Sequence, residues 1–316
     1  MIKRCEEEQL DLLLIAGDLF HRQPLLRELK EVNYLFSKLT KTRVVLIAGN
    51  HDYVKPDSYY LTFPWNENVF PLLSDSMEWI EFPEIQTCIY GFSYHRREIT
   101  ESLYDEARPG QRQPYEILLA HGGDERHIPI RKQKLKALGY DYIALGHIHK
   151  PQKLNDSAIR YAGAPEPIDK NDIGPHGYIV GEISAAGTRT KFVKSAVREY
   201  IHLIVEVEEA MTGFALREKI RSAIEDNGRQ NIYKVILKGL RDPEVLFDPD
   251  SMDTYGNILE IIDETRPAYD FEKLEAENRD NLLGKFIGRM KGYDPGTIES
   301  FALYEGVRAI LKAKRG

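Results

Sequence analysis

The chain has 316 residues, of which 42% are hydrophobic and 29% are charged, a composition typical of a globular protein with a full buried core. No apolar run reaches the roughly 18 residues of a membrane span, and the polar start lacks the pattern of a signal peptide, so we expect a cytoplasmic protein. The two cysteines are too few for a disulfide framework or a thiolate zinc site. The formal net charge of −7 excludes a general basic surface, so any contact with DNA has to come from a local patch or through bound metal.

Alternating strands and helices are predicted along the first part of the chain. Residues 1–9 are polar and resemble the last turns of a helix, and the apolar run 11–16 predicts a strand that ends at Gly17-Asp18. Apolar residues at helical spacing predict an amphipathic helix over 24–39. A second apolar run, 44–48, predicts a buried strand that is followed by Gly49-Asn50-His51-Asp52.

Further strands are predicted over 79–82, 87–92, 115–120 and 141–145, and a short basic helix over 130–138. The last two of these strands end in His121-Gly122 and in Gly146-His147-Ile148-His149. Alternating segments separated by turn signals over 160–193 predict a second sheet, made of antiparallel strands.

The pattern changes near residue 194, and we predict three domains. Residues 1–193 carry the polar clusters at the strand ends. Residues 194–245 predict a small β-α-β accessory domain, with strands over 200–206 and 232–238 around a helix over 212–226. Residues 246–316 predict a C-terminal helical region, with helices over 252–262, 281–290 and 297–314.

The polar side chains at the strand ends predict a metal site. They offer a carboxylate, an amide and imidazoles, which are ligands for hard and borderline metals: Asp18, Asn50, His121, His147 and His149. The carboxyl ends of parallel strands meet at one edge of a sheet, where ligands bind in open α/β folds. A carboxylate shared by two ions about 3.5–4 Å apart would suit a two-metal phosphoesterase, with His51 as general acid or as a group that stabilises the transition state.

Each of these residues also has an ordinary explanation. A lone Asp or His after a strand is more often a helix cap or a satisfied polar residue. Four clusters at four strand ends, however, favour a shared metal or phosphoester site over packing alone.

Four segments resemble motifs of the calcineurin-like metallophosphoesterases: Leu14-Ile-Ala-Gly-Asp-Leu-Phe, Ala48-Gly-Asn-His-Asp, Leu118-Leu-Ala-His-Gly and Ala144-Leu-Gly-His-Ile-His. The residues of these motifs and their spacing are similar to those of the SbcD-type and Mre-type DNA-repair exonucleases. The resemblance covers about residues 10–185. It implies an α/β fold, a metallophosphoesterase β-sandwich flanked by helices, followed by a small α+β accessory domain and C-terminal helices.

The resemblance also implies roles for the strand-end residues. Asp18 is expected to bridge two divalent metal ions, which are usually manganese in this family. Asn50, His121 and His147 are expected to hold the second ion and His149 the first, and His51 is expected to be the catalytic histidine beside the scissile phosphate. The implied partners are DNA, an SMC-like ATPase subunit and a second copy of the chain in a homodimer.

Two departures from the family pattern bear on activity. The family opens with a strand that ends in Asp-x-His, and this sequence has no such motif. We therefore expect that the first strand is missing, that Met1 is an internal methionine, and that the first ion, left with Asp18 and His149, binds weakly. This form is then expected to be poorly stable and weakly active or inactive. The second departure is His21, where the family commonly has Asp; His21 could replace a ligand, but a role beside the site or on the surface is favoured.

One compact basic cluster stands out: Arg131, Lys132, Lys134 and Lys136. It could contact a phosphate backbone, although a solvated helix face is the more common use of such a charge run. His95, His127, His176 and His202 have no strand-end partner and are interpreted as structural residues.

The sequence therefore predicts a hydrolase that acts on ester bonds, a metal-dependent DNA exonuclease or phosphodiesterase of DNA repair. Two alternatives stay open. One is a metallophosphatase or phosphodiesterase that acts on a small molecule or on a phosphoprotein, and the other is a non-catalytic scaffold.

Overall fold

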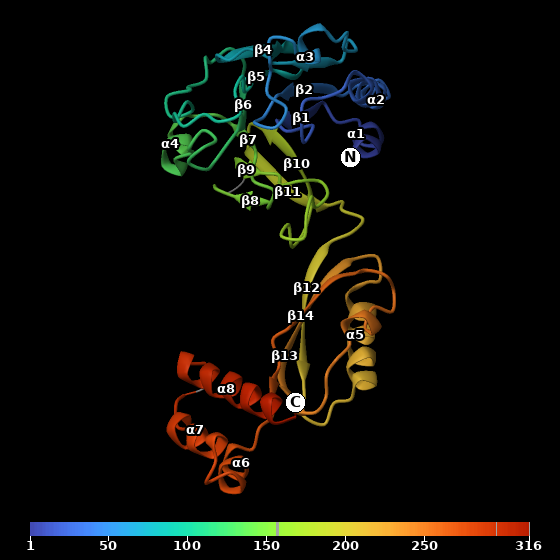
Figure 1. The fold of residues 1–316 in the computed structure, drawn as a ribbon. Coiled ribbons are helices and arrows are strands. Elements are labelled where there is room, and N and C mark those ends of the chain that lie inside the picture. The colour runs from blue at the N-terminus through green and yellow to red at the C-terminus, as the bar shows by residue number, and fades with distance from the viewer. Residues whose placement is uncertain (156–157, 295, 316) are drawn as a thin grey trace. The chain divides into compact units, whose positions relative to one another are not determined.

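The computed structural model describes residues 1–155, 158–294 and 296–315. The chain forms two compact units, Met1–Glu199 and Tyr200–Gly316, which Figure 1 draws in order of colour. Both units combine helices with β-sheets, so the predicted α/β class is confirmed. The predicted division into three domains, with boundaries after residues 193 and 245, stays a prediction.

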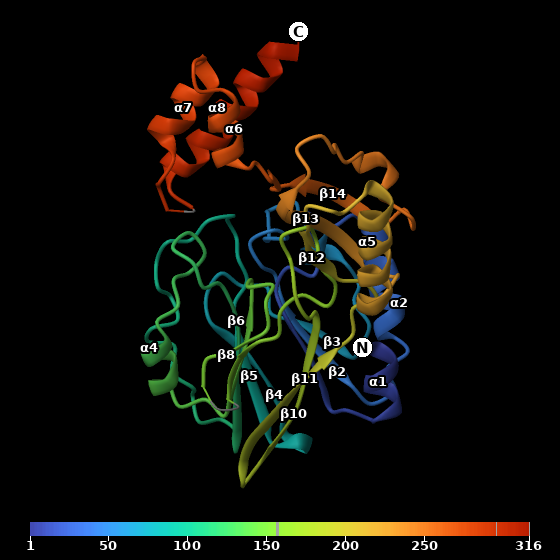
Figure 2. The same cartoon turned by 90° about the horizontal axis from the view of Figure 1, so that it is seen from below.

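The first sheet of the N-terminal unit is parallel and has the order β1-β2-β3. Its strands are β1 (Leu12–Ala16), β2 (Arg43–Ile47) and β3 (Val69–Pro71). Because side chains alternate along a strand, β2 separates two layers. Val44 and Leu46 pack with α1 (Ile2–Glu7) and α2 (Leu26–Phe36), and Figure 2 shows both helices on one side of this sheet. Val45 and Ile47 belong to a different cluster on the opposite face.

The second sheet has the order β4-β5-β6-β7-β9-β8. Its strands are β4 (Glu78–Phe82), β5 (Thr87–Gly91), β6 (Tyr115–His121), β7 (Tyr142–Gly146), β8 (Gln152–Lys153) and β9 (Ile159–Tyr161). Ile89, Ile117 and Leu119 pack in one buried cluster with Val45 and Ile47 of the first sheet. The two sheets therefore form the predicted sandwich, with this cluster between them.

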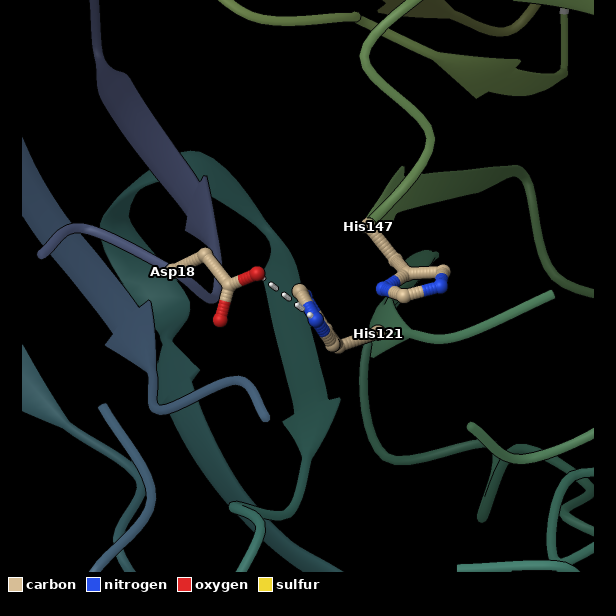
Figure 3. A group of neighbouring side chains, drawn as sticks. All are labelled: Asp18, His121 and His147. Carbon is tan, nitrogen blue, oxygen red and sulfur yellow. Dashed lines mark ion pairs between the residues drawn. The ribbon is translucent and has the colours of Figure 1, made fainter. Parts of the chain in front are cut away.

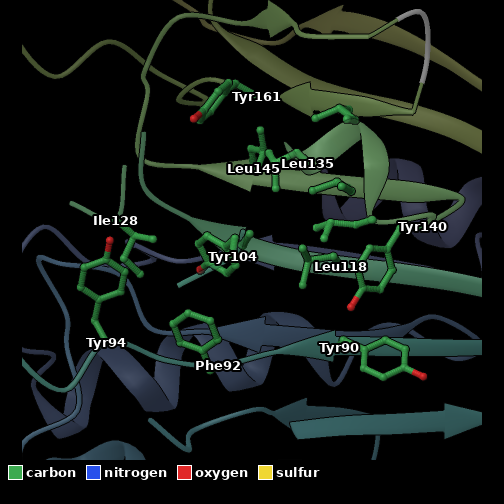
Figure 4. Close-up of a cluster of buried hydrophobic side chains, with 14 of the residues drawn as sticks. Tyr90, Phe92, Tyr94, Tyr104, Leu118, Ile128, Leu135, Tyr140, Leu145 and Tyr161 are labelled. Carbon is green, nitrogen blue, oxygen red and sulfur yellow. The ribbon is translucent and has the colours of Figure 1, made fainter. Parts of the chain in front are cut away.

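The outer face of the second sheet is covered by α4 (Lys132–Ala137) and neighbouring loops. Leu135 of α4 packs with Leu118 and Leu145 of the sheet, together with several buried tyrosines that Figure 4 shows. The other helical segments of this unit are short: α3 (Tyr59–Thr62) and the 3-10 helix η1 (Pro83–Ile85).

An antiparallel hairpin, β10 (Gly177–Ser184) and β11 (Gly187–Lys194), completes the N-terminal unit. The antiparallel sheet predicted over 160–193 is therefore confirmed only in its second half, because β9 pairs parallel to β7 in the larger sheet. In the described part of the chain, β1 and β3 are the two edge strands of the first sheet. A groove of about 500 Å³ lies beside β1, and its apolar lining includes Leu12, Leu14, Ile117, Tyr142, Ile179 and Ile183.

The C-terminal unit contains the predicted β-α-β element: β12 (Tyr200–Val207), α5 (Gly213–Asn227) and β13 (Ile232–Arg241), with the two strands parallel. The predicted helix over 252–262 is wrong, because β14 (Ile258–Asp263) lies there and pairs with β13. Its β-branched residues favour a strand, and Ile258 and Ile261 pack into the core below α5. The short β15 (Arg266–Pro267) also pairs with β13, so this sheet extends past residue 245 into the region predicted to be helical.

The chain continues through α6 (Phe271–Glu277), α7 (Leu282–Met290) and α8 (Ile298–Arg315), with the 3-10 helix η2 (Pro249–Ser251) before β14. Leu283, Ile287, Leu303 and Val307 form the small core of this helical region. Among the described residues, no helix has both the length and the apolar character needed to cross a membrane.

Candidate metal centre

Asp18 follows β1 in a backbone conformation that few side chains adopt. The φ angles of Gly17 and Asp18 are 84° and 51°, and a Cβ at Gly17 would lie 2.5 Å from Nδ1 of His121, so the position needs glycine. The two carboxylate oxygens of Asp18 face different partners. Oδ1 accepts a hydrogen bond of 2.9 Å from the backbone N–H of His51, and Oδ2 lies 3.3 Å from Nε2 of His121, as Figure 3 shows.

Asn50 follows β2 in a turn that the fully buried Asp52 holds in place. The Asp52 carboxylate accepts hydrogen bonds from the N–H groups of Gly49 and Phe20, at 2.7 and 3.2 Å, and from the Tyr60 hydroxyl at 2.8 Å. Burial raises the pKa of Asp52 to about 6. Asp52 belongs to the tetrapeptide Gly49-Asn50-His51-Asp52, but its sequence position alone indicates no role. In the structure, the Asp52 carboxylate holds the turn by hydrogen bonds, and in this turn Asn50 is only 3% exposed.

His121, at the end of β6, is fully buried and held on three sides. Its Nδ1 lies 2.8 Å from the carbonyl oxygen of Ala16, and because a carbonyl only accepts, Nδ1 carries a proton. Its backbone N–H donates to the Tyr104 hydroxyl at 2.9 Å, and its carbonyl oxygen accepts from the Tyr94 hydroxyl at 3.2 Å; both tyrosines are labelled in Figure 4. In the neutral ring Nε2 therefore has a free lone pair, 2.8 Å from Oδ1 of Asn50.

His147 follows β7 with a φ of 93°, a strained value for a residue with a side chain. Gly146 is required before it, because a Cβ there would lie 1.8 Å from the carbonyl oxygen of Ala16. Nε2 of His147 lies 2.7 Å from a carboxylate oxygen of Asp124. Nδ1 of the same ring lies 3.0 Å from Oδ1 of Asn50. Since a carboxylate accepts, Nε2 carries the proton and Nδ1 has the free lone pair.

Four acceptor atoms thus converge at the strand ends, and with both imidazoles neutral none of the four carries a proton: Asp18 Oδ2, Asn50 Oδ1, His121 Nε2 and His147 Nδ1. The ligand atoms of Asp18, His121 and His147 all lie within 4.8 Å of one another, and Figure 3 shows these three side chains directed toward a common space. Converging lone pairs repel one another unless a cation lies between them. Carboxylate, amide and imidazole ligands suit a divalent metal ion, so the residues fit a metal centre.

The same cluster attracts a proton. Burial by itself lowers the pKa of His121, but the hydrogen bond and the charge of Asp18 outweigh burial, so the pKa is raised. Burial by itself raises the pKa of Asp18, but the hydrogen bond from His121 outweighs burial, so the pKa of Asp18 is lowered. Because a metal ion competes with this proton for the same atoms, we expect metal binding to release it.

The other predicted site residues surround the open side of the centre. A pocket of about 340 Å³ is lined by Asp18, His51, His147, Ile148, His149, Lys150 and Asp172. His149 lies outside the converging group; its Nδ1 is 2.9 Å from a carboxylate oxygen of Asp172. His51 stacks on His21 with 4.5 Å between the ring centroids. Desolvation, the largest effect, lowers the pKa of His51, so the ring is neutral at pH 7.

Two carboxylates that contact the histidines after β7 were not predicted from the sequence. Asp124 contacts His147, and Asp172 contacts His149. Asp124 contacts both His147 and His127, and the centroids of these two rings are 4.6 Å apart. The premise that His127 has no partner at the strand ends is therefore wrong, while its interpretation as a structural residue stays a prediction. The spacing Asp124-x-x-His127 directly after His121-Gly-Gly indicates that these residues could meet. Asp172 lies in a loop whose sequence pattern does not indicate a contact with His149.

The predicted basic cluster on α4 is partly neutralised. Arg131 forms an ion pair of 2.9 Å with Asp105, and Lys134 forms one of 3.2 Å with Glu106. Lys132 and Lys136 are exposed. The contact of this cluster with DNA stays a prediction.

Comparisons with known proteins identify relatives of this chain. The sequence profile of the calcineurin-like phosphoesterases matches residues 1–151. YhaO of Bacillus subtilis, described as an uncharacterized metallophosphoesterase, is 27% identical over 281 residues, which cover 84% of this chain and 68% of the relative. The DNA double-strand break repair protein Mre11 of Methanopyrus kandleri is 25% identical over 273 residues, which cover 75% of this chain and 58% of the relative. The chain thus spans less than two thirds of the length of the second relative.

Proposed function

Residues 1–151 of this chain form a calcineurin-like metallophosphoesterase domain, and from that premise we propose that the protein is a metal-dependent phosphodiesterase that cuts DNA, as an exonuclease of DNA repair. The superfamily consists of hydrolases that use divalent metal ions. The single observation that carries the proposal is the convergence of four acceptor atoms at the ends of β1, β2, β6 and β7.

The proposed metal ligands divide into two sets, and Asp18 would contribute to both. Asn50, His121 and His147 would hold the second ion, and His149 would hold the first. Bound divalent cations supply positive charge to the phosphoryl oxygens and lower the pKa of water. Manganese is proposed from the family resemblance. Since the first set has fewer ligands among the described residues, we expect it to bind its ion more weakly.

His51 is proposed as the catalytic histidine of the open side. Its ring lines the pocket beside Asp18 and His149. Being neutral at pH 7, the ring can donate a hydrogen bond to a phosphate oxygen, and at lower pH it can deliver a proton to the leaving oxygen. Lys150 lines the same pocket and offers a positive charge to the phosphate, while His21 supports the His51 ring by stacking.

Two observations support DNA as the substrate. A relative over three quarters of the chain is named as a DNA double-strand break repair protein, and the chain carries a separate folded unit after residue 199 that small-substrate hydrolases often lack. The proposed partners are DNA, bound in part by the cluster of Arg131, Lys132, Lys134 and Lys136, an SMC-like ATPase subunit, and a second copy of the chain. The cytoplasm is the proposed location.

A small phosphoester is the second candidate substrate, and specific observations favour it. The pocket has a volume of only about 340 Å³, and two of the four basic residues on α4 are already paired with acidic residues. Both features suit a compact substrate better than a long polyanion.

The test uses the whole chain with Mn²⁺, an end-labelled DNA duplex and bis(p-nitrophenyl) phosphate. We expect Mn²⁺-dependent release of short products from the duplex at a low rate, because the first ligand set has few ligands among the described residues. EDTA should abolish this release, and so should His51→Ala, which controls for contaminating nucleases. Hydrolysis of the nitrophenyl ester without any cleavage of duplex would support the second candidate. Tight Mn²⁺ binding without hydrolysis of either substrate would support the scaffold alternative.

A Mn²⁺ titration by calorimetry tests the two proposed ligand sets. We expect one tight site and one site that is weaker by at least about 100-fold, which corresponds to a difference of about 3 kcal/mol. Two equally tight sites would contradict the assignment of His149 and Asp18 as an incomplete set.

A further inference from the structure

The loop between β6 and α4 carries a carboxylate that its own turn holds in place. Oδ1 of Asp124 accepts hydrogen bonds from the backbone N–H groups of Arg126 and His127, at 2.8 and 3.0 Å. The loop begins at Gly122, directly after β6, with a φ of 141°, and it folds back so that His127 lies against Gly122. A Cβ at Gly122 would lie 2.4 Å from the carbonyl oxygen of His127, so glycine permits the close approach.

Asp124 then joins two imidazoles. Oδ2 lies 2.7 Å from Nε2 of His147, and Oδ1 lies 2.9 Å from Nδ1 of His127. The two histidine side chains are 12% and 17% exposed, whereas Asp124 is 48% exposed. The carboxylate is therefore the most exposed member of this group, and the His147 ring lies between it and Asn50 of the metal centre.

The chemistry of this group differs from that of the inner cluster. Asp124, His127 and His147 also place their ligand atoms within 4.8 Å of one another, so the group could be mistaken for another metal site. Here, however, two N–H donors face one carboxylate, and the arrangement is complete without a cation. In the inner cluster, by contrast, lone pairs face lone pairs.

We propose that Asp124 is the positioning residue for His147. By accepting the Nε2 proton of His147, the carboxylate fixes the tautomer and the rotation of the ring, so that the lone pair of Nδ1 faces Oδ1 of Asn50. The φ of 93° at His147 is a strained conformation that needs such support. His127 holds the carboxylate from the other side. A carboxylate behind a histidine ligand raises its basicity and fixes its orientation.

The consequence for metal affinity rests on the proposed function, but the tautomer of His147 is a property of the metal-free protein. The experiment therefore measures both. Asp124→Asn keeps an acceptor oxygen without the charge, and Asp124→Ala removes the acceptor. Asp105→Asn is the matched control, because Asp105 forms an ion pair with Arg131 and, in the part of the chain that the structure describes, no hydrogen bond joins it to either ring.

In EDTA, ¹⁵N NMR of histidine-labelled protein is expected to show the Nε2–H tautomer of His147 in the wild type and in Asp105→Asn. Asp124→Ala is expected to lose it, and Asp124→Asn is expected to give an intermediate result. In calorimetric Mn²⁺ titrations, the tight site of Asp124→Ala is expected to weaken by about 10- to 100-fold. Asp124→Asn is expected to weaken less, and Asp105→Asn not at all.

Three results would overturn the inference. The first is an unchanged His147 tautomer in Asp124→Ala. The second is a changed tautomer with unchanged Mn²⁺ affinity in a protein that binds the ion tightly. The third is loss of one bound ion with the tight site intact, which would make Asp124 a ligand of a separate site. If the wild type binds no Mn²⁺, the proposed function fails, while the tautomer comparison still decides whether Asp124 positions His147.

Discussion

The buried wall of the metal centre (Asn50, Asp52 and His121) and its open side (His21, His51 and His149) are both built from polar residues near strand ends, but they are held differently. The wall residues are between 0% and 3% exposed, and hydrogen bonds hold the Asp52 carboxylate and the His121 ring in place. On the open side, His51 rests on a stacked ring and His149 on one carboxylate. The wall should therefore determine stability and metal affinity, while the open side should determine turnover.

The largest expected effect separates turnover from stability on the open side. His51→Ala should lower kcat by about 10²- to 10⁴-fold, the usual contribution of a general acid or base. The free energy of unfolding should change by less than about 1 kcal/mol, because His51 is only half-buried and lies at the edge of the pocket, and Mn²⁺ affinity should stay the same. His95→Ala, at an exposed histidine outside the site, is the control. A loss of stability comparable to the loss of activity would remove the distinction between the two sides.

The next effect should appear on the buried wall. His121→Ala leaves a cavity and an unpaired Ala16 carbonyl, so we expect the metal-free protein to lose about 3–5 kcal/mol of unfolding free energy, as other buried rings do. Tight Mn²⁺ binding should be lost as well. His149→Ala is the matched variant on the open side and should leave stability nearly unchanged. Urea denaturation in EDTA measures both, and equal losses would contradict the comparison.

Asp52 should give the wall a pH dependence. Its pKa rises from 3.8 in the unfolded chain to about 6 in the folded protein, so the folded state binds this proton more tightly. The resulting stability is fully present below pH 3.8 and is lost as the pH rises through about 6, a change of about 3 kcal/mol.

The measurement is the difference in unfolding free energy between the wild type and Asp52→Asn, in EDTA, from pH 4 to 7. Subtraction removes the shared histidine titrations, and the altered hydrogen bonds of the variant add only an offset. The wild type should lose stability relative to the variant as the pH rises. A difference that is constant with pH, or one of opposite sign, would show that Asp52 is ionised throughout.

A smaller effect is expected where the wall meets the tyrosine cluster. Tyr104→Phe leaves the buried backbone N–H of His121 without its acceptor, which costs about 1–3 kcal/mol. Tyr34→Phe, at a residue that is 64% exposed, should cost almost nothing. Thermal unfolding of the metal-free proteins gives both values. If Tyr104→Phe were as stable as the wild type, another group would have to satisfy His121.

The sequence predicted the polar residues at the strand ends better than the loop carboxylates behind them, and the reason is physical. Apolar runs such as 11–16 and 44–48 must form buried strands, so the polar residues that follow them are placed at a shared edge. Asp18, Asn50, His121 and His147 were predicted to meet in this way, and the structure brings them together. The roles of these residues as metal ligands nevertheless stay predictions.

Loops carry no such periodic signal. The spacing of Asp124 and His127 indicates that these two residues meet. The approach of Asp124 to His147 and of Asp172 to His149 depends on the path of the folded chain, which neither spacing nor hydrophobic pattern predicts. The segment 252–262 shows the converse error. Its apolar residues fit a helical spacing, but Ile258, Ile261 and Ile262 form a strand because they can pair with β13 and pack below α5.

The smallest effect on stability, and a test of the substrate, is expected on α4. Lys132→Glu combined with Lys136→Glu should change unfolding free energy by less than about 0.5 kcal/mol, because both residues are exposed. If the protein acts on DNA, the double variant should bind duplex more weakly, and the slope of log affinity against log salt should fall by about 1 for each lost phosphate contact. Lys3→Glu, on α1, is the control and should change neither quantity. An unchanged salt slope in the double variant, with Mn²⁺-dependent hydrolysis of the nitrophenyl ester intact, would favour a small phosphoester as the substrate.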